Sequence, residues 1–250
     1  MPGEHAKLSA SGSKRWMECP GSILLEEMYE EEDSEYAAEG TQAHALAEIM
    51  LRHQVLKCVM ESDVQELRDK ADAEMRRYTT EYVEYCKDLY DNMMLKHKDT
   101  VAFIEERVRY DEWAEEGYGT VDFCVIGGDE IHIVDLKYGK GVPVSAEGNP
   151  QPRLYAKGAL QELGFLYDLK KIKMHIVQPR LQSISTEEMT VAELLKWGED
   201  VLIPRAKKAF IGTREYSPGS HCKFCKARAT CKARANKVLN SIAAILTKGE

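Results

Sequence analysis

Two acidic residues and one lysine stand at the ends of neighbouring apolar runs, where charged side chains are costly. Asp122 lies within the apolar run 121–126, and Asp135 and Lys137 close the run that begins at Ile131. An isolated charge in a core shifts its pKa or needs a partner, and a divalent cation is such a partner. Residues i and i+2 of a strand point to one face, so Asp135 and Lys137 can act together. This pattern predicts a metal-dependent hydrolytic site.

The carboxylates in this pattern suit Mg²⁺ or Mn²⁺, which are hard cations that prefer oxygen ligands. Lys137 can position or deprotonate an attacking water, or stabilise the negative charge that develops during phosphodiester hydrolysis. One metal ion or two would be compatible with the pattern. The Asp-x-Lys motif alone is weak, because strand ends at a protein surface often carry it.

Three further polar residues flank the acidic strands. A lone helical histidine such as His44 is more often a core residue, but its position upstream of the two acidic strands favours a metal ligand. Gln151 and Tyr155 are spaced i and i+4 on a downstream helical segment, so they share one face and can hold a phosphate or orient the nucleophile. Helix capping and core packing are the plain alternative for these two residues.

Hydrophobic periodicity predicts the elements that must position these side chains. Serine and glycine predict irregular structure over residues 1–25. The predicted helices span residues 36–59, 63–98, 151–163 and 190–210. The predicted strands span residues 101–109, 119–126, 130–137, 171–178 and 183–189. This order predicts an α/β core, with a mixed central sheet flanked by helices, and not a helical bundle.

We expect residues 1–250 to form a single domain. Within it we expect a helical N-terminal part over 26–98, a catalytic core over 101–189, and a C-terminal helix with a cysteine-rich basic segment over 190–250. No run of about 18 apolar residues and no signal-peptide pattern occur, so we expect a cytoplasmic protein that does not contact membranes. The chain lacks a Gly-x-x-x-x-Gly-Lys-[Ser/Thr] sequence, which argues against an ATP-driven motor.

Charge is distributed unevenly along the chain. The net charge is −8, but residues 201–250 hold eleven Lys or Arg against two Glu, a local charge of +9, so the remainder carries −17. Such asymmetry can place a basic patch on an acidic body, and a solvated basic helix is the equal alternative. Residues 26–39 hold eight acidic residues and no basic ones, which predicts a solvated helix face or loop.

Cysteine usage indicates a metal site. Seven cysteines, an odd number, without a secretion signal argue against a disulfide framework. The x2 and x5 spacing of Cys222, Cys225 and Cys231 suits a metal but leaves it one ligand short, and Cys19 is the natural fourth. Structural Zn²⁺ and an iron–sulfur cluster accept four thiolates equally well. The other three are predicted to be buried apolar residues: Cys58, Cys86 and Cys124.

Basic residues interleave with the late cysteines and can hold a DNA backbone without reading its sequence. They are Lys223, Lys226, Arg228, Lys232 and Arg234. Phe224 lies among them and can stack on a base or pack against the metal centre.

The ordered set of His44, Asp122, Asp135-x-Lys137 and Gln151-x-x-x-Tyr155 resembles the RecB-like branch of the PD-(D/E)xK nuclease superfamily. The resemblance spans roughly residues 39–158, and the split cysteines at both ends resemble those of the iron-staple members of this branch. The ordered set is specific, whereas any single piece of it is not. The resemblance implies a PD-(D/E)xK restriction-endonuclease-like core.

The same resemblance implies roles for individual residues. The metal would be bound by His44, Asp122, Asp135 and the carbonyl of Leu136. Lys137 would be catalytic, Gln151 and Tyr155 would face DNA, and Glu106 matches a less regular acidic position. The four cysteines Cys19, Cys222, Cys225 and Cys231 would hold a structural [4Fe-4S] cluster. Tyr138-Gly139-Lys140 departs from the Thr-Gly that often follows the lysine in relatives, which leaves the DNA contacts of this loop open.

The expected function is that of a metal-dependent deoxyribonuclease, an exonuclease acting on DNA ends or single strands in recombination, repair or phage DNA metabolism. Its expected partners are DNA and a helicase, recombinase or annealing protein. One rival is a non-catalytic DNA-binding or scaffold protein that retains the nuclease fold, against which the intact motif set argues. The other rival is a zinc-dependent regulatory protein, which leaves the order from His44 to Tyr155 unexplained.

Overall fold

The computed structural model describes residues 6–29 and 35–246. The chain divides into two compact units. The first unit comprises Met1–Glu32, Tyr110–Tyr118 and Lys196–Glu250, and the second comprises Asp33–Arg109 and Gly119–Leu195. None of the helices in the described residues combines the length and the apolar character needed to cross a bilayer.

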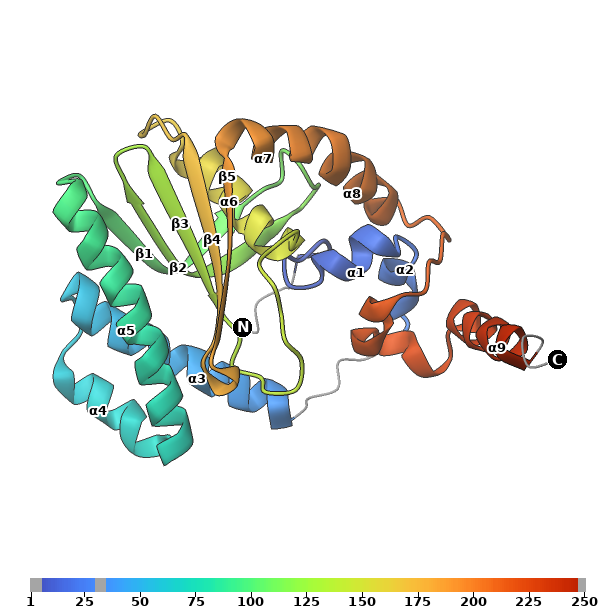
Figure 1. Ribbon diagram of the computed structural model, residues 1–250, viewed down its shortest axis with the longest axis horizontal. Coiled ribbons are helices and arrows are strands. Elements are labelled where there is room, and N and C mark those ends of the chain that lie inside the picture. The colour runs from blue at the N-terminus through green and yellow to red at the C-terminus, as the bar shows by residue number, and fades with distance from the viewer. Residues whose placement is uncertain (1–5, 30–34, 247–250) are drawn as a thin grey trace. The chain divides into compact units, whose positions relative to one another are not determined.

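The second unit is built on a five-stranded sheet in the order β1-β2-β3-β4-β5 (Figure 1). The strands are β1 (Val101–Arg109), β2 (Tyr118–Gly127), β3 (Glu130–Leu136), β4 (Lys171–Gln178) and β5 (Ser183–Thr190). Strand β3 pairs antiparallel with β2 and parallel with β4, and β4 pairs antiparallel with β5. The predicted α/β class, with a mixed central sheet flanked by helices, is therefore confirmed.

The helices of this unit include one that connects the parallel strands β3 and β4. They are α3 (Glu35–Leu51), α4 (Glu61–Lys70), α5 (Ala73–Lys96), α6 (Pro150–Leu163) and α7 (Val191–Trp197). Helix α6 lies in the crossover from β3 to β4, since parallel neighbours cannot be joined by a tight turn. The prediction of one helix over 63–98 was wrong, because the backbone is extended at Ala71 and Asp72. Asp72 instead caps α5 by accepting the Met75 N–H at 2.7 Å.

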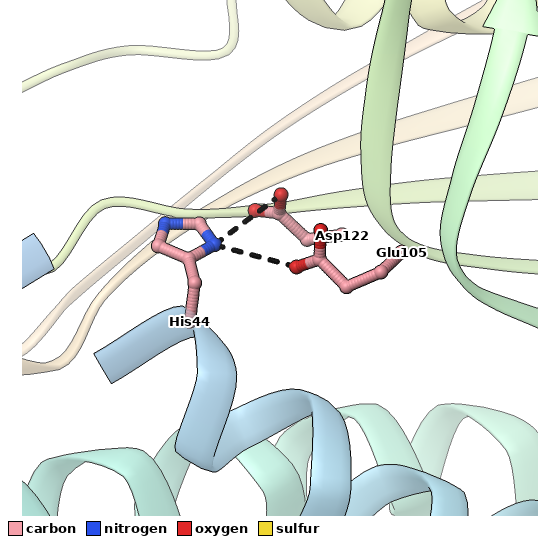
Figure 2. Close-up of side chains that lie close together, drawn as sticks. All are labelled: His44, Glu105 and Asp122. Carbon is pink, nitrogen blue, oxygen red and sulfur yellow. Dashed lines mark ion pairs between the residues drawn. The ribbon is translucent and has the colours of Figure 1, made fainter. Parts of the chain in front are cut away.

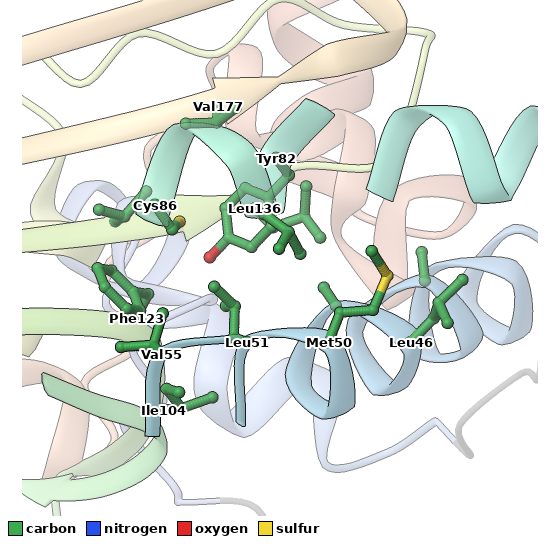
Figure 3. Close-up of a cluster of buried hydrophobic side chains, with 14 of the residues drawn as sticks. Leu46, Met50, Leu51, Val55, Tyr82, Cys86, Ile104, Phe123, Leu136 and Val177 are labelled. Atoms are coloured by element: carbon green, nitrogen blue, oxygen red, sulfur yellow. The ribbon is translucent and has the colours of Figure 1, made fainter. Parts of the chain in front are cut away.

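The main apolar core lies between the sheet and helices α3 and α5 (Figure 3). It includes Leu46, Met50, Tyr82, Cys86, Phe123, Val134, Leu136 and Val177. Successive residues of a strand point to opposite faces, so burying Phe123 and Val134 here turns Asp122 and Asp135 toward the other face. Helix α6 packs closely against β1, because a Cβ on Gly158 would lie 2.8 Å from the Val108 side chain.

The first unit is mainly helical. Its elements are α1 (Ser13–Glu18), α2 (Ser22–Glu26), α8 (Ile203–Phe210), the 3₁₀ turns Ser220–Phe224 and Lys226–Ala229, and α9 (Lys232–Leu246). The prediction of irregular structure before residue 25 was wrong for α1 and α2. Trp16 anchors α1, since its ring is fully buried and its Nε1 donates to the Ser9 carbonyl at 2.9 Å.

The acidic run 26–39 is not a uniformly solvated face. Glu26 is buried, accepts the Lys226 N–H at 2.8 Å and pairs with Arg15 at 2.7 Å. Glu39 pairs with Arg180 at 2.9 Å. Glu26 is structural because burial favours paired charges, and Glu39 is paired although its side chain is partly exposed. Residues 30–34 of the run lie outside the described residues.

The three cysteines expected in the core differ in their burial. Cys86 and Cys124 are buried, as predicted. Cys58 is exposed, so its prediction was wrong. It follows the π-helical turn Arg52–Leu56 and Lys57, whose left-handed backbone (φ 56°) ends the helix and directs the chain away from the core.

Candidate functional site

Asp122 and Asp135 occupy the point where the β2–β3 ladder ends. The last registered pair of the ladder at this end is Phe123 with Val134, so Asp122 and Asp135 are the next residues along it. Asp122 Oδ2 accepts the Leu136 N–H at 2.6 Å, and this side-chain contact takes the place of a further ladder bond. The Asp122 carboxylate is therefore held by strand backbone. Both residues are buried, since Asp122 is 8% exposed and Asp135 is 2% exposed.

One candidate cation site stands out in the second unit. His44, Glu105 and Asp122 each bring one ligand atom within 4.8 Å of the others (Figure 2). Over residues 6–29 and 35–246, no other three His, Cys, Asp or Glu side chains are gathered so closely. His44 Nδ1 lies 3.5 Å from one oxygen of each carboxylate. An imidazole nitrogen and two carboxylates fit a divalent cation, although they do not select which one.

The acidic residue that strand β1 contributes is Glu105 and not Glu106. Glu106 is exposed, whereas Glu105 is partly buried, and a Glu105 carboxylate oxygen lies 3.5 Å from His44 Nδ1. Glu105 has a left-handed backbone (φ 48°). Arg52 holds this bend by donating from Nη2 to the Ile104 carbonyl at 2.9 Å. No local sequence signal marks the bend, because glutamate rarely adopts positive φ.

Asp135 belongs to a second, adjoining network. Lys137 Nζ donates a hydrogen bond to Asp135 Oδ1 at 3.1 Å. The same ammonium lies 2.8 Å from Asp135 Oδ2 and forms an ion pair with it, without the alignment of a hydrogen bond. Gln151 donates from Nε2 to Asp135 Oδ1 at 2.8 Å and accepts from Lys137 at 2.9 Å. Its Nε2 also lies 3.0 Å from Tyr155 Oη. The structure thus joins these four predicted residues in one hydrogen-bonded network.

Burial and neighbouring charges shift the pKa values of two site residues. Burial alone would lower the pKa of His44, but its hydrogen bonds and its attraction to Asp122 and Glu105 outweigh burial and raise the pKa to about 10. Burial raises the pKa of Asp135 to about 6, with Lys137 opposing the shift and Asp122 adding to it. A proton on His44 therefore neutralises part of the carboxylate charge, as a metal cation would.

Cation binding at this site should depend on pH. A metal ion at Nδ1 must displace the His44 proton, so below a pKa of about 10 binding should tighten about tenfold for each unit that the pH rises. The window from pH 7 to pH 9 lies above the titration of Asp135 and below that of His44. Isothermal titration with Mn²⁺ across this window measures the slope. His44→Gln should flatten it, and an equal slope in that variant would contradict this assignment.

Arg180 fixes the residue that follows the lysine. Its guanidinium lies 4.7 Å from the Tyr138 ring centroid and pairs with Glu39 at 2.9 Å and Glu74 at 2.8 Å. The Arg180 side chain is only 4% exposed. This contact gives a structural reason for Tyr138 at the position where relatives often have threonine, because its ring stacks against the Arg180 cation. Through Glu39 and Glu74, Arg180 also joins α3, which carries His44, to α5.

Replacing Arg180 should therefore be costly. We expect Arg180→Ala to lower the free energy of unfolding by about 2–3 kcal/mol, less than for a fully buried pair because Glu39 and Glu74 are partly exposed. Arg77→Ala is the matched control, since Arg77 forms an exposed i,i+4 pair with Glu81. Its expected cost is under about 0.5 kcal/mol. Urea denaturation of both variants gives the comparison, and equal costs would contradict the role assigned to Arg180.

The four predicted cysteine ligands line one small cavity of the first unit. Cys19, Cys222, Cys225 and Cys231 border about 20 Å³ of space, which is enough for one water. No three of these sulfurs lie within 4.8 Å of one another, so a compact single-ion site is not formed. Thiol Cys222 already accepts a hydrogen bond from the Gly219 N–H at 3.3 Å.

The N-terminal and C-terminal segments of the first unit are joined around this cavity by polar contacts. His221 Nδ1 lies 2.6 Å from Glu18 Oε2, and Gly21 donates its N–H to the Glu215 carbonyl at 2.9 Å. Burial raises the pKa of Cys19, with hydrogen bonds from backbone N–H groups lowering it and the nearby Cys222 and Cys231 adding to the rise. Burial likewise raises the pKa of the Cys225 thiol to about 11. The segments are therefore held together by contacts that need no metal.

The five basic residues predicted to hold DNA are all exposed on the same unit: Lys223, Lys226, Arg228, Lys232 and Arg234. Phe224 is 62% exposed, so it does not pack into the cavity and its ring is available to solvent. The roles of these residues in DNA binding stay predictions. Metal binding by the Leu136 carbonyl also stays a prediction; in the structure the Leu136 N–H donates to Asp122.

Comparison with known proteins identifies a family, but the description of that family names no activity. A family model described as "protein of unknown function (DUF2800)" matches residues 5–248. Among solved structures, one described as the crystal structure of SSO0001 is 13% identical, covers 77% of this chain and 85% of its own, and has a TM-score of 0.32. A score this low does not define a shared fold.

Proposed function

The chain belongs to the DUF2800 family, whose function is unknown, so its activity has to be inferred from its site, and we propose that it is a metal-dependent nuclease. The proposed enzyme is a nuclease of the RecB-like, PD-(D/E)xK kind, and it hydrolyses phosphodiester bonds at DNA ends or in single strands. The observation that carries it is the adjacency of two groups. His44, Glu105 and Asp122 can take a cation, and Asp135 holds Lys137 and Gln151 next to Asp122 in the strand register.

The residues present fit a divalent cation. Asp122 and Asp135 are buried carboxylates, and Asp135 Oδ2 accepts no aligned hydrogen bond from any described residue. The Lys137 ammonium lies 2.8 Å from this oxygen and compensates part of the buried charge, and a metal cation beside Asp122 would compensate more of it. A bound Mg²⁺ or Mn²⁺ supplies a water of lowered pKa and Lewis-acid stabilisation of a phosphoryl oxygen.

The chain's own residues can perform the remaining work. Hydrolysis joins a water oxygen to phosphorus and breaks one ester bond, so negative charge builds on the phosphoryl oxygens. The Lys137 ammonium is held by Asp135 and by Gln151 Oε1, so it is positioned in advance to stabilise this charge. Gln151 is itself anchored to Asp135 and Tyr155, which limits the rotation of the amide. Positioning before reaction is what makes such a cation effective.

The proposal is tested by digesting end-labelled DNA with the purified full chain. Single-stranded, double-stranded and circular substrates should be compared, with Mg²⁺, with Mn²⁺ and with chelator. We expect metal-dependent release of short products from DNA ends and little cutting of circles. Tight DNA binding without cleavage in either metal would instead support a scaffold that retains the fold.

For the cysteine cavity we propose a [4Fe-4S] cluster with a structural role. Four thiolates are normal ligands for it, and tetrahedral Zn²⁺ with bonds of about 2.3 Å would require sulfurs roughly 3.8 Å apart. The cysteine sulfurs are not gathered to that extent. Arg228 and Arg234 also border the cavity and are exposed, so they can move outward to admit a larger group. Iron and sulfide analysis of anaerobic protein tests this, and stoichiometric zinc in colourless protein would contradict it.

The exposed basic residues between and after these cysteines support DNA as the partner. Lysine and arginine side chains bind backbone phosphates and release counterions, so binding should weaken steeply with salt. A helicase, recombinase or annealing protein remains a proposed companion, because the motif that would supply ATP-driven movement is absent from the sequence.

A further inference from the structure

The cysteine cavity is bordered by more than thiols. Arg15, Ser22 and His221 also line it, and each has a buried polar atom with no hydrogen-bond partner among the described residues. These atoms are Arg15 Nε, Ser22 Oγ and His221 Nε2. A buried polar group without a partner is destabilising, and native proteins contain few of them. Of the three, Arg15 Nε and Ser22 Oγ can donate, and two unpaired donors around one cavity indicate a site built for a ligand that offers hydrogen-bond acceptors.

Two of these residues are fixed through their other polar atoms. Glu26 Oε2 lies 2.7 Å from Arg15 Nη2, and Glu26 itself is buried. Glu18 Oε2 accepts from His221 Nδ1 at 2.6 Å, since a carboxylate can only accept. The atoms left over are therefore Arg15 Nε and His221 Nε2. Residues around metal centres are commonly oriented by such outer hydrogen bonds.

We infer that Arg15 and Ser22 donate hydrogen bonds to the sulfur atoms of the centre that the four cysteines hold. This inference rests on the proposed iron–sulfur cluster. A [4Fe-4S] cluster with four thiolates carries net negative charge and presents inorganic sulfides beyond its protein ligands, so it can accept several donors at once. The potential of such clusters depends on hydrogen bonds to the sulfurs.

The side chain of Ser22 offers a clean test. Its Oγ is buried and makes no hydrogen bond within the described chain, so Ser22→Ala breaks no protein contact. Ser13 is the matched control, because its Oγ is equally buried and unpaired but Ser13 does not line the cavity. In cluster-free protein both variants should raise Tm similarly, by about 2–4 °C, because each removes an unpaired hydroxyl.

In cluster-loaded protein the two variants should differ. Ser22→Ala should release iron to a chelator about tenfold faster than the unmodified chain. It should also lower the midpoint potential, since a donor stabilises the more negative, reduced state. Ser13→Ala should change neither quantity. Arg15→Lys is a second probe, because lysine can keep a charge near Glu26 but lacks Nε.

The outcomes separate this inference from the cofactor proposal. Protein that holds iron and sulfide, with iron release and potential unchanged in both Ser22→Ala and Arg15→Lys, would overturn the donor role and leave the cluster standing. Protein without iron and sulfide would overturn both. Faster release in Ser22→Ala with unchanged Ser13→Ala supports the inference directly, without reference to nuclease activity.

Discussion

Lys137→Ala should reduce metal-dependent DNA cleavage by at least about 10³-fold, because it removes the one cation that the site holds between Asp135 and Gln151. Asp135→Ala should have an effect of the same order, since Asp135 anchors both Lys137 and Gln151. The two losses should not add in the double variant, because the residues act as one unit. Initial rates on end-labelled DNA with Mg²⁺ and Mn²⁺ measure the effect.

A matched lysine distinguishes chemistry from general charge. Lys171 is 57% exposed and pairs with Glu130 on the same sheet, so Lys171→Ala should cut DNA at close to the normal rate. Circular dichroism should show that all three single variants keep their fold. Undiminished cleavage by both Lys137→Ala and Asp135→Ala would falsify the proposed nuclease site.

Glu105→Gln should weaken Mn²⁺ binding by about 10- to 100-fold. The same substitution at the neighbouring residue, Glu106→Gln, should change the Mn²⁺ dissociation constant by less than about twofold. The reason is geometric. Glu105 places a carboxylate oxygen 3.5 Å from His44 Nδ1, while Glu106 is exposed to solvent. Both substitutions remove one negative charge from β1, so long-range electrostatics are matched. Isothermal titration at pH 8 gives the two dissociation constants.

The reverse ranking, with the larger loss of Mn²⁺ affinity in Glu106→Gln, would contradict the assignment of Glu105 as the metal ligand from β1. Glu105→Gln also has an expected effect without metal. Burial raises the pKa of Glu105, so the neutral amide removes a buried charge, while His44 loses one of its two carboxylate partners. The pKa of His44 should therefore fall, which two-dimensional NMR of the imidazole can follow.

Much of the fold could be predicted from local pattern. The five strands lie within a few residues of their predicted bounds, because alternation and the Gly127-Gly128 turn are local properties. The break between α4 and α5 was not predicted, because in the sequence Asp72 is one more polar residue among many. The structure shows that its side chain caps α5 by accepting the Met75 N–H. Helices α1 and α2 were missed because they are short and depend on tertiary burial, of Trp16 in α1 and Ile23 in α2, and not on helix propensity.

The candidate site divides in the same way. The residue types and order of His44, Asp122, Asp135, Lys137, Gln151 and Tyr155 are visible in the sequence, since each sits at a predictable position of a strand or helix. The choice of Glu105 over Glu106 is not visible, because it depends on a left-handed backbone at Glu105 beside the Ile104 carbonyl, which Arg52 binds from a segment distant in the sequence. The contact between Tyr138 and Arg180 is not visible either, because the two residues are far apart in the sequence.

For the cysteines, the sequence by itself determined that four thiols at this spacing could share a metal, because spacing is a chain property. Only the tertiary structure decided that they border one cavity together with Arg15, Ser22 and His221. Their unpaired atoms arise from burial, which depends on how segments about 200 residues apart pack. Sequence thus determines which chemistry is available, and packing determines which groups are desolvated and aligned to perform it.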